Sequence, residues 1–402
     1  MGRSSSDKEG SEKLVEVSGR NSYNSMYTVH WKDGHSSKYP FVWLQDNCRC
    51  SACYHPSSYQ RLALMANLDP EVKPTQEEIT EDGSLLKITW PNNHVGEYPS
   101  TWLRNHQFDK GNHDPISDLK SKPWGAELAD KIPRFKFGDI INNDEVLFDW
   151  LRTLHETGLA VLTDAPTKPG AVEAIGKRVA YLRETVYGKK FQVYSKFNTS
   201  SLAYTSAELG LHVDLPFYGC CPGVQMLHCI RQTKSTGGDN QFADAFNAAL
   251  ILKKEYPAEY KLLTTVNIYF RNCGTDHVAE YHLIKGRPMF EEDSEGNFKQ
   301  VYYNDQVRAS YLDVPVDKVQ DVYRAMKLFH QTLYKHNISI KLRDGEVVTF
   351  NNTRVMHGRS GFTVDVSSAE QVRHYEGGYL EWDEIFSRLR VLRENKEGEF
   401  RV

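Results

Sequence analysis

The sequence lacks any long apolar run. Across its 402 residues no stretch approaches the roughly 18 apolar residues that a membrane-spanning helix needs, so we expect no membrane partner. The first residues, MGRSSSDKEGSEKLVEV, contain no apolar core for a secretory signal, and their acidic side chains argue against a mitochondrial presequence. Together these absences predict a cytoplasmic protein.

A strong excess of charge is missing as well. The formal net charge is -4 at pH 7, which does not match the basic balance of a nucleic-acid-binding protein. Hydrophobic residues make up 40% and charged residues 25%, as is ordinary for a globular chain with a sizeable core. We therefore expect no nucleic-acid partner.

The cysteines are few, and their number is odd. Seven cysteines without a secretory signal favour reduced thiols over disulfides. Cys48, Cys50 and Cys53 can wrap one Zn²⁺ and leave one tetrahedral position open. His94, in a turn after a predicted strand, is the expected fourth ligand, whereas His55 is too close to Cys53 to reach back. Such a closed site is structural, and three unconnected thiols are the alternative.

Short strands dominate residues 25–104. Met26–Trp31 and Tyr39–Leu44 read as strands on either side of an Asp33-Gly34 turn. The predicted core of this segment is thin for its length, and a metal commonly stabilises modules of this kind. Residues 105–133 are polar and rich in turn formers, which is typical of a linker.

The remaining chain combines strands with a few helices. Asn143 and Asp144 are expected to begin one amphipathic helix, and residues 170–187 to form a second. Asp317 is the predicted N-cap of a later helix. Many short strands with flanking helices favour a mainly β fold, specifically a double-stranded β-helix or jelly roll.

One short motif suggests the chemistry. His212 and Asp214 form the only His-x-Asp in the chain, and on a strand such residues point to the same face. Two histidines and one carboxylate with other positions open are what a non-haem Fe(II) oxygenase needs, and His357 is the candidate third ligand. With 15 histidines, roughly one such motif is expected by chance, so the motif alone does not establish an iron site.

Taken together, the motifs are more specific. Over about residues 25–393 the sequence resembles the γ-butyrobetaine dioxygenase family of the Fe(II)/2-oxoglutarate oxygenase superfamily. The resemblance rests on VWLQDNCRCSACY at 42–54, ITWP at 88–91 with His94, His212-x-Asp214, PGVQ at 222–225 with LHC at 227–229, TGGD at 236–239 and HGR at 357–359.

This resemblance implies the roles of the metal ligands and the co-substrate residues. It implies that His212, Asp214 and His357 bind iron, that Cys48, Cys50, Cys53 and His94 bind zinc, and that Arg373 and Leu227 contact 2-oxoglutarate. A planar guanidinium can hold a carboxylate through two hydrogen bonds, which suits Arg373 to the distal end of that co-substrate.

The resemblance also implies a substrate site with several altered positions. The implied substrate-binding residues are Tyr187, Phe191, Ser201, Tyr204, Asn304 and Tyr379. Aromatic faces suit a trimethylammonium group, which has no N–H to donate. Phe191 stands where the family typically has tryptophan, Ser201 where it has asparagine, and Leu215 replaces a tyrosine.

The implied reaction is hydroxylation of γ-butyrobetaine to L-carnitine, with Fe(II), 2-oxoglutarate, O₂ and ascorbate required and succinate and CO₂ released. The resemblance further implies a homodimer. Two alternatives stay open, namely a hydroxylase of another betaine such as N6-trimethyllysine and a non-catalytic, zinc-stapled binding module. The predicted domains are a disordered N-terminus (1–24), a zinc-binding N-terminal domain (25–104), a linker (105–133) and a catalytic domain (134–402).

Overall fold

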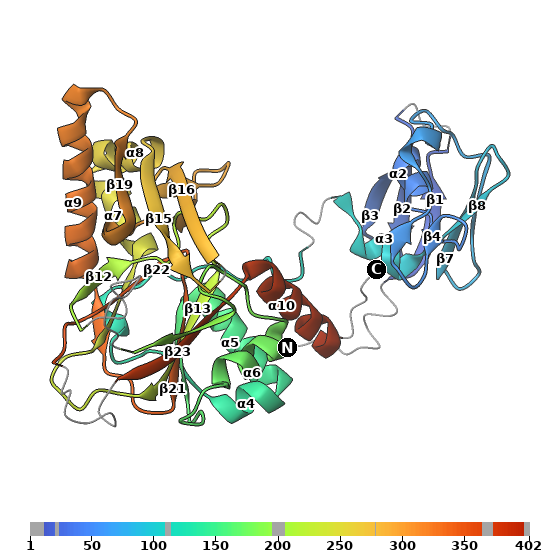
Figure 1. The fold of residues 1–402 in the computed structure, drawn as a ribbon. Coiled ribbons are helices and arrows are strands. Elements are labelled where there is room, and N and C mark those ends of the chain that lie inside the picture. Colours follow the sequence, from blue (N-terminus) through green and yellow to red (C-terminus); the bar gives the residue numbers. More distant parts are fainter. Residues whose placement is uncertain are drawn as a thin grey trace. The chain divides into compact units, whose positions relative to one another are not determined.

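Two compact units make up the chain. The computed structural model describes residues 12–20, 24–108, 114–194, 206–277, 279–363 and 373–397. One unit ends at Ser117 and the other begins at Asp118, and each has a hydrophobic core of its own (Figure 1). Among the described helices, none has both the length and the apolar character that crossing a membrane requires.

The described part of the first unit contains two small antiparallel sheets, a two-stranded ribbon and two short α-helices. One sheet has the order β1-β2-β3 and the other β6-β7-β8, while β4 and β5 form a separate two-stranded ribbon. The elements are β1 (Leu14–Ser18), β2 (Met26–Trp31), β3 (Ser36–Pro40), α2 (Phe41–Asp46), β4 (Tyr54–His55), β5 (Gln60–Arg61), η1 (Met65–Asn67), β6 (Gln76–Ile79), β7 (Leu85–Thr89), β8 (Val95–Pro99) and α3 (Ser100–Asn105).

Aromatic residues fill the core of this unit. Alternate residues of β2 are buried, as the period of a strand with one covered face requires. The predicted strand over Tyr39–Leu44 is wrong, because β3 ends at Pro40 and Phe41 begins α2. Phe41 and Leu44, three residues apart, are both buried, and a helical turn puts them on one face.

The described part of the second unit contains two larger sheets, two smaller ones (β16-β15-β19 and β17-β18) and flanking helices. Its N-terminal half comprises η3 (Ala126–Leu128), β9 (Arg134–Lys136), α4 (Phe137–Asn142), α5 (Asp144–Glu156), β10 (Leu159–Thr163), α6 (Ala171–Val179), β11 (Lys190–Val193), β12 (Leu209–His212), β13 (Val224–Arg231), β14 (Asn240–Asp244), α7 (Ala245–Glu255) and α8 (Pro257–Thr265). Its C-terminal half comprises β15 (Ile268–Asp276), β16 (Ala279–Arg287), β17 (Phe290–Glu292), β18 (Phe298–Val301), η5 (Asp305–Val307), β19 (Arg308–Leu312), η6 (Val316–Lys318), α9 (Val319–Lys335), β20 (Ile338–Ile340), β21 (Glu346–Asn351), β22 (Val355–Arg359), β23 (His374–Leu380) and α10 (Trp382–Glu397).

The predicted jelly roll is confirmed. A six-stranded sheet with the order β11-β23-β13-β21-β10-β9 accompanies a four-stranded sheet with the order β12-β22-β14-β20. Phe242 of the smaller sheet meets Phe350 of the larger one at a ring-centroid distance of 5.4 Å, so the core lies between the two sheets. Helix α5 packs on β10 and β21, and α6 packs on β13 and β23 (Figure 1).

The helix boundaries agree in part with expectation. Asn143 caps α5 as predicted, because its side-chain oxygen accepts hydrogen bonds from the backbone N–H groups of Glu145 and Val146. The helix predicted over residues 170–187 is too long, since α6 ends at Val179. There the chain turns back, and Leu182 packs so closely on Gly176 that a Cβ would lie 2.7 Å from it. Asp317 is not a cap, because it lies inside η6 and α9 follows it.

Candidate functional site

The three predicted iron ligands lie together. Strand β12 ends at His212, and His357 lies directly opposite on the antiparallel strand β22, so the two rings share one face. Their centroids are 4.1 Å apart. Asp214 places Oδ1 3.2 Å from His212 Nε2 and 3.7 Å from His357 Nε2. The three ligand atoms all lie within 4.8 Å of one another, a geometry that suits a metal bound from one side.

Their surroundings favour the protonation states that a metal requires. His212 Nδ1 lies 2.8 Å from the carbonyl oxygen of Gly210; a carbonyl only accepts, so Nδ1 carries the hydrogen and Nε2 stays free to coordinate. Burial is the main cause that lowers the pKa of His357 to about 3, and electrostatic repulsion from His212 is the second. Burial alone raises the pKa of Asp214, but His357, His212 and Tyr379 outweigh it and hold that pKa well below its usual range. Neutral imidazoles and a carboxylate are the forms that bind a metal.

A buried asparagine holds the backbone of Asp214. Asn352, fully buried, accepts a hydrogen bond from Asp214 N at 2.7 Å and donates to Asp214 O at 3.1 Å and to Pro222 O at 3.0 Å. Tyr379 donates to Asp214 Oδ2 at 2.7 Å, which leaves Oδ1 for the histidine side. Leu215 then adopts a left-handed φ of 59°, a costly conformation for a residue with a Cβ, and it turns the chain sharply after the carboxylate.

Asn352 should therefore matter for metal binding although it touches no metal. Replacing it with leucine leaves the backbone N–H and C=O of Asp214 without partners, and we expect Fe(II) to bind roughly 10–100-fold more weakly. Equilibrium dialysis with Fe(II) in the absence of O₂ measures this. Asn142→Leu, an exposed change on α4, is the matched control. A folded Asn352→Leu variant with unchanged Fe(II) affinity would contradict the role.

Arg373 lines a cavity that opens onto the triad. Arg373 is 5% exposed, and its guanidinium lies 3.7 Å from the ring centroid of Tyr375 and donates a long hydrogen bond of 3.5 Å to Asn240 Oδ1. Leu227 lines the same cavity, as predicted from the resemblance. The residues around it are Phe191, Val193, Leu209, His212, Asp214, Gln225, Leu227, Asn240, Phe242, His357, Gly358, Arg359, Arg373 and Tyr375.

This cavity is electropositive at one end. Arg359 and Arg373 both line it, both are 5% exposed, and among the described residues Arg373 forms no ion pair with a carboxylate. Burial is the main cause that lowers the pKa of Arg359 to about 10, and the positive charge of Arg373 is the second. A buried guanidinium beside a metal-type triad suits a small dianion that reaches from Arg373 to the metal. The sequence did not indicate Arg359 or Asn240 as site residues. Arg359 is the last residue of the HGR motif at 357–359, and Asn240 directly follows the TGGD motif at 236–239.

An aromatic wall, formed by Tyr187, Phe191 and Tyr379, adjoins the triad. Phe191 lies between Tyr187 and Tyr379, with ring centroids 6.5 Å and 5.4 Å away respectively. Because Tyr379 also donates to Asp214, the wall directly abuts the triad. The hydroxyl of Tyr187 accepts a hydrogen bond of 3.0 Å from Asn272 on β15, a neighbour that the sequence did not indicate.

The other predicted substrate contacts differ in their positions. Ser201 and Tyr204 lie outside the described residues. Asn304 is buried, and it donates to Val213 O at 3.3 Å and accepts from Gln306 N at 3.1 Å, so both ends of its amide already have partners in the protein. Its neighbour along the chain, the buried Tyr303, instead bonds Val213 N through its backbone oxygen at 2.8 Å.

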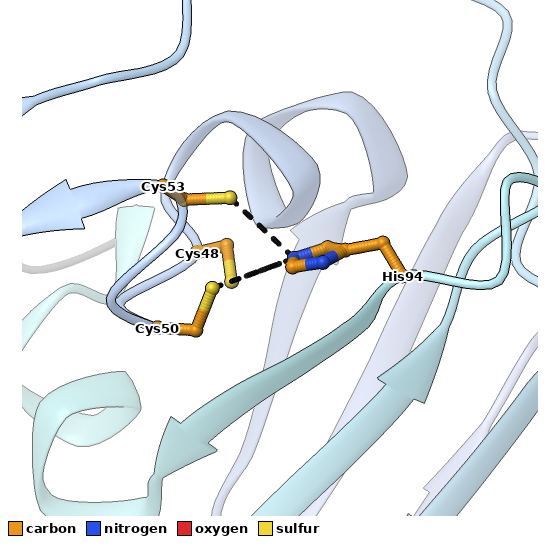
Figure 2. A group of neighbouring side chains, drawn as sticks. All are labelled: Cys48, Cys50, Cys53 and His94. Carbon is orange, nitrogen blue, oxygen red and sulfur yellow. Dashed lines mark hydrogen bonds between the residues drawn. The ribbon is translucent and has the colours of Figure 1, made fainter.

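The first unit contains the predicted cysteine cluster. Figure 2 shows the three thiols facing one edge of the His94 ring, which comes from the turn between β7 and β8. His94 Nε2 lies 3.3 Å from Cys48 Sγ, 3.7 Å from Cys50 Sγ and 3.4 Å from Cys53 Sγ. His55, the alternative ligand, is exposed and outside this cluster.

The spacing of this cluster fits zinc. A tetrahedral Zn²⁺ with ordinary Zn–S and Zn–N bonds separates sulfur from nitrogen by about 3.6 Å, which lies within the range of the three contacts. Burial raises the pKa of Cys48, and it raises that of Cys53 to about 12, whereas backbone hydrogen bonds outweigh burial and lower the pKa of Cys50. Two of the three thiols therefore need a nearby cation to become thiolates. A metal held by these four side chains would have no position left for a substrate, which is the arrangement of a structural site.

Two family models match the chain. The taurine catabolism dioxygenase TauD, TfdA family matches residues 115–379, and the gamma-butyrobetaine hydroxylase-like N-terminal family matches residues 20–104. Among solved structures, an asparagine oxygenase covers 64% of this chain and 91% of its own, with a TM-score of 0.48 and 13% identity.

Curated relatives extend over nearly the whole chain. A γ-butyrobetaine dioxygenase of Homo sapiens is 36% identical over 375 residues, covering 92% of this chain and 95% of that protein. A γ-butyrobetaine dioxygenase of Pseudomonas sp. (strain AK-1) is 32% identical and covers 92% and 94%. A mitochondrial trimethyllysine dioxygenase of Rattus norvegicus is 30% identical and covers 88% and 83%.

Proposed function

Because the chain belongs to the taurine catabolism dioxygenase TauD, TfdA family, we propose that it hydroxylates γ-butyrobetaine to L-carnitine with Fe(II) and 2-oxoglutarate. The chain is a dioxygenase, and each turnover consumes O₂ and 2-oxoglutarate and releases succinate and CO₂, with one oxygen atom entering the product. Ascorbate is expected to keep the iron reduced. The non-catalytic binding module is disfavoured by this membership.

One observation carries the proposal. Tyr379 connects the two halves of the site, because its hydroxyl holds Asp214 Oδ2 at 2.7 Å while its ring packs against Phe191. An aromatic surface that suits a quaternary ammonium thus lies beside a triad that suits iron. The assay that tests the proposal measures succinate formation with γ-butyrobetaine as substrate.

The protein's own residues position the reactants. In this proposal His212, Asp214 and His357 hold Fe(II), which supplies the oxidative chemistry when bound. Arg373 binds the distal carboxylate of 2-oxoglutarate through its guanidinium, with Leu227 as an apolar contact along the carbon chain. Holding 2-oxoglutarate and the metal in fixed positions makes a bimolecular step effectively unimolecular, which lowers its entropic cost. The step needs no general base, since a C–H bond is broken oxidatively.

The remaining parts of the proposal concern assembly and location. Cys48, Cys50, Cys53 and His94 hold a structural zinc in the N-terminal domain. The protein acts on a small molecule as a cytoplasmic homodimer, without a nucleic-acid or membrane partner. The zinc-binding domain, the linker and the catalytic domain are proposed as predicted from the sequence, except that the first domain already includes β1 (Leu14–Ser18), which pairs with β2, while residues 1–11 of the predicted disordered N-terminus lie outside the described residues.

N6-trimethyllysine is the second candidate substrate. Trimethyllysine dioxygenases are among the relatives, at 28% to 30% identity for those of Meyerozyma guilliermondii and Rattus norvegicus. The family residues replaced by Phe191, Ser201 and Leu215 are expected to contact substrate, so changes at these positions alter its fit. The higher identity to γ-butyrobetaine dioxygenases favours the first substrate.

Phe191 offers a direct test of the aromatic wall. Tryptophan binds a cation through its ring face more strongly than phenylalanine, and the whole cation–π attraction is about 0.5–2 kcal/mol, of which the exchange of one ring for the other gains only a part. Phe191→Trp is therefore expected to lower KM for γ-butyrobetaine severalfold and to change KM for 2-oxoglutarate less. Phe191→Leu, which keeps an apolar side chain without a ring, should raise KM for the betaine. Equal KM values in the three proteins would remove Phe191 from the substrate site.

A further inference from the structure

A second cavity in the catalytic unit contains none of the predicted site residues. Its volume is about 470 Å³, and it lies among α8, β16, β17 and the segment that follows Asp214. The residues that matter for its chemistry are Gly219, Lys261, Lys285, Arg287, Glu291 and Glu292.

Arg287 gives this cavity a buried positive charge. Arg287 is 7% exposed, and its guanidinium donates hydrogen bonds to the backbone oxygens of Tyr218 at 2.6 Å and Gly219 at 3.1 Å. It also lies 4.1 Å from the ring centroid of Tyr302 and 3.7 Å from Cys221 Sγ. These neighbours are all uncharged, and Nε has no hydrogen-bond partner among the described residues. Buried charges in proteins are normally paired, so this one lacks its counter-ion.

The other charges of the cavity do not supply that counter-ion. Glu291 is paired with Lys299 at 2.7 Å, and Glu292 with Lys253 at 2.8 Å. Both glutamates thus have lysine partners that are not part of the lining. Neither Lys261 of α8 nor Lys285 of β16 forms an ion pair with a described residue. Lys261 does act on Glu292 electrostatically, since its charge helps to lower the pKa of that carboxyl, so Arg287 and Lys285 are the lining cations that lack a carboxylate partner among the described residues.

We propose that this cavity binds a small oxyanion, a carboxylate or a phosphate, between Arg287 and the ammonium groups of Lys261 and Lys285. A guanidinium without a carboxylate partner and two exposed ammonium groups are charges that attract such anions. Arg287 also donates hydrogen bonds to the backbone of Tyr218 and Gly219, in the segment between Asp214 and β13. The anion would therefore lie next to the segment that follows the triad residue Asp214. The site does not depend on the proposed reaction or its substrate.

Isothermal titration tests this site. Inorganic phosphate and succinate are titrated separately into the enzyme that already holds Fe(II) and saturating 2-oxoglutarate, without O₂, so that the Arg373 cavity is filled. We expect saturable binding of at least one anion with one site per chain. The tighter of the two identifies the class of ligand. Absence of saturable binding with both anions overturns the proposal.

Matched variants place the bound anion. Lys261→Gln together with Lys285→Gln removes two exposed charges without disturbing the backbone contacts of Arg287, and it should weaken the binding about tenfold. Lys327→Gln together with Lys335→Gln, two exposed lysines of α9, should leave it unchanged. Because the first pair lies only at the Arg287 cavity, equal affinity in that variant and the wild type also overturns the proposal.

Discussion

Replacing His212 with alanine is expected to abolish both Fe(II) binding and turnover. The loss should exceed the roughly 10–100-fold that removing an outer partner of a metal ligand costs, because a coordinating atom itself disappears. His212 is buried and lies 3.2 Å from Asp214 Oδ1, so alanine also leaves this carboxylate without a neighbour. Succinate formation and the iron content of the purified protein measure the two losses.

The same variant should keep its zinc and its fold. The cysteine cluster belongs to the first unit and His212 to the second, and each unit has its own core. His336→Ala, at the C-terminus of α9 and outside the triad, is the control and should retain iron and activity. Persistent turnover in a folded His212→Ala protein would show that the triad assignment is wrong.

Replacing Cys48 with serine is expected to release zinc and unfold the first unit. Structural zinc contributes about 10–16 kcal/mol in small metal-dependent domains, which is comparable to the whole stability of an ordinary domain. Cys48 is buried against the aromatic core, so the missing ligand cannot be replaced by water from outside. The first unit should become sensitive to protease, and the near-UV signal of Trp31, Trp90 and Trp102 should diminish.

His55 provides the control for the zinc site. It is exposed and follows Cys53 closely, but it contacts Ser57 and Ser58 instead of the cluster. His55→Ala should retain zinc and protease resistance. Full zinc content and an intact first unit in Cys48→Ser would contradict a structural role for the metal.

The ligand sets could be predicted because their signals are local or carried by a resemblance. His212 and Asp214 share a face by the period of a strand, and three cysteines within six residues converge on one point by chain geometry alone. The convergence of His357 with them needed the resemblance, since the pairing of β12 with β22 joins residues far apart in the chain.

The residues that were missed act through long-range contacts. Asn352 is one asparagine among many in the sequence, and its importance comes from bonding both polar backbone groups of Asp214. The sequence does not single out Arg287 either, because only the fold shows that its charge is buried without a counter-ion. Such roles depend on burial and on hydrogen-bond or ion-pair partners, which the hydrophobic periodicity of a sequence does not indicate.

The wrong boundaries have a related cause. The amphipathic stripe after Gly170 continues past the true end of α6, but the close approach of Leu182 to Gly176 makes the chain turn back. Likewise the apolar run at Phe41–Leu44 suits a buried strand or a helix equally well, and the core of the first unit decides for the helix.

The most direct test of the central claim is the coupling of succinate formation to substrate. The purified protein is incubated with Fe(II), 2-oxoglutarate, ascorbate and O₂, with γ-butyrobetaine or N6-trimethyllysine in parallel, and succinate and hydroxylated product are quantified together. We predict that γ-butyrobetaine stimulates succinate formation more than N6-trimethyllysine, and that one L-carnitine forms for each succinate. No stimulation by γ-butyrobetaine, or a clear preference for N6-trimethyllysine, would contradict the proposed function.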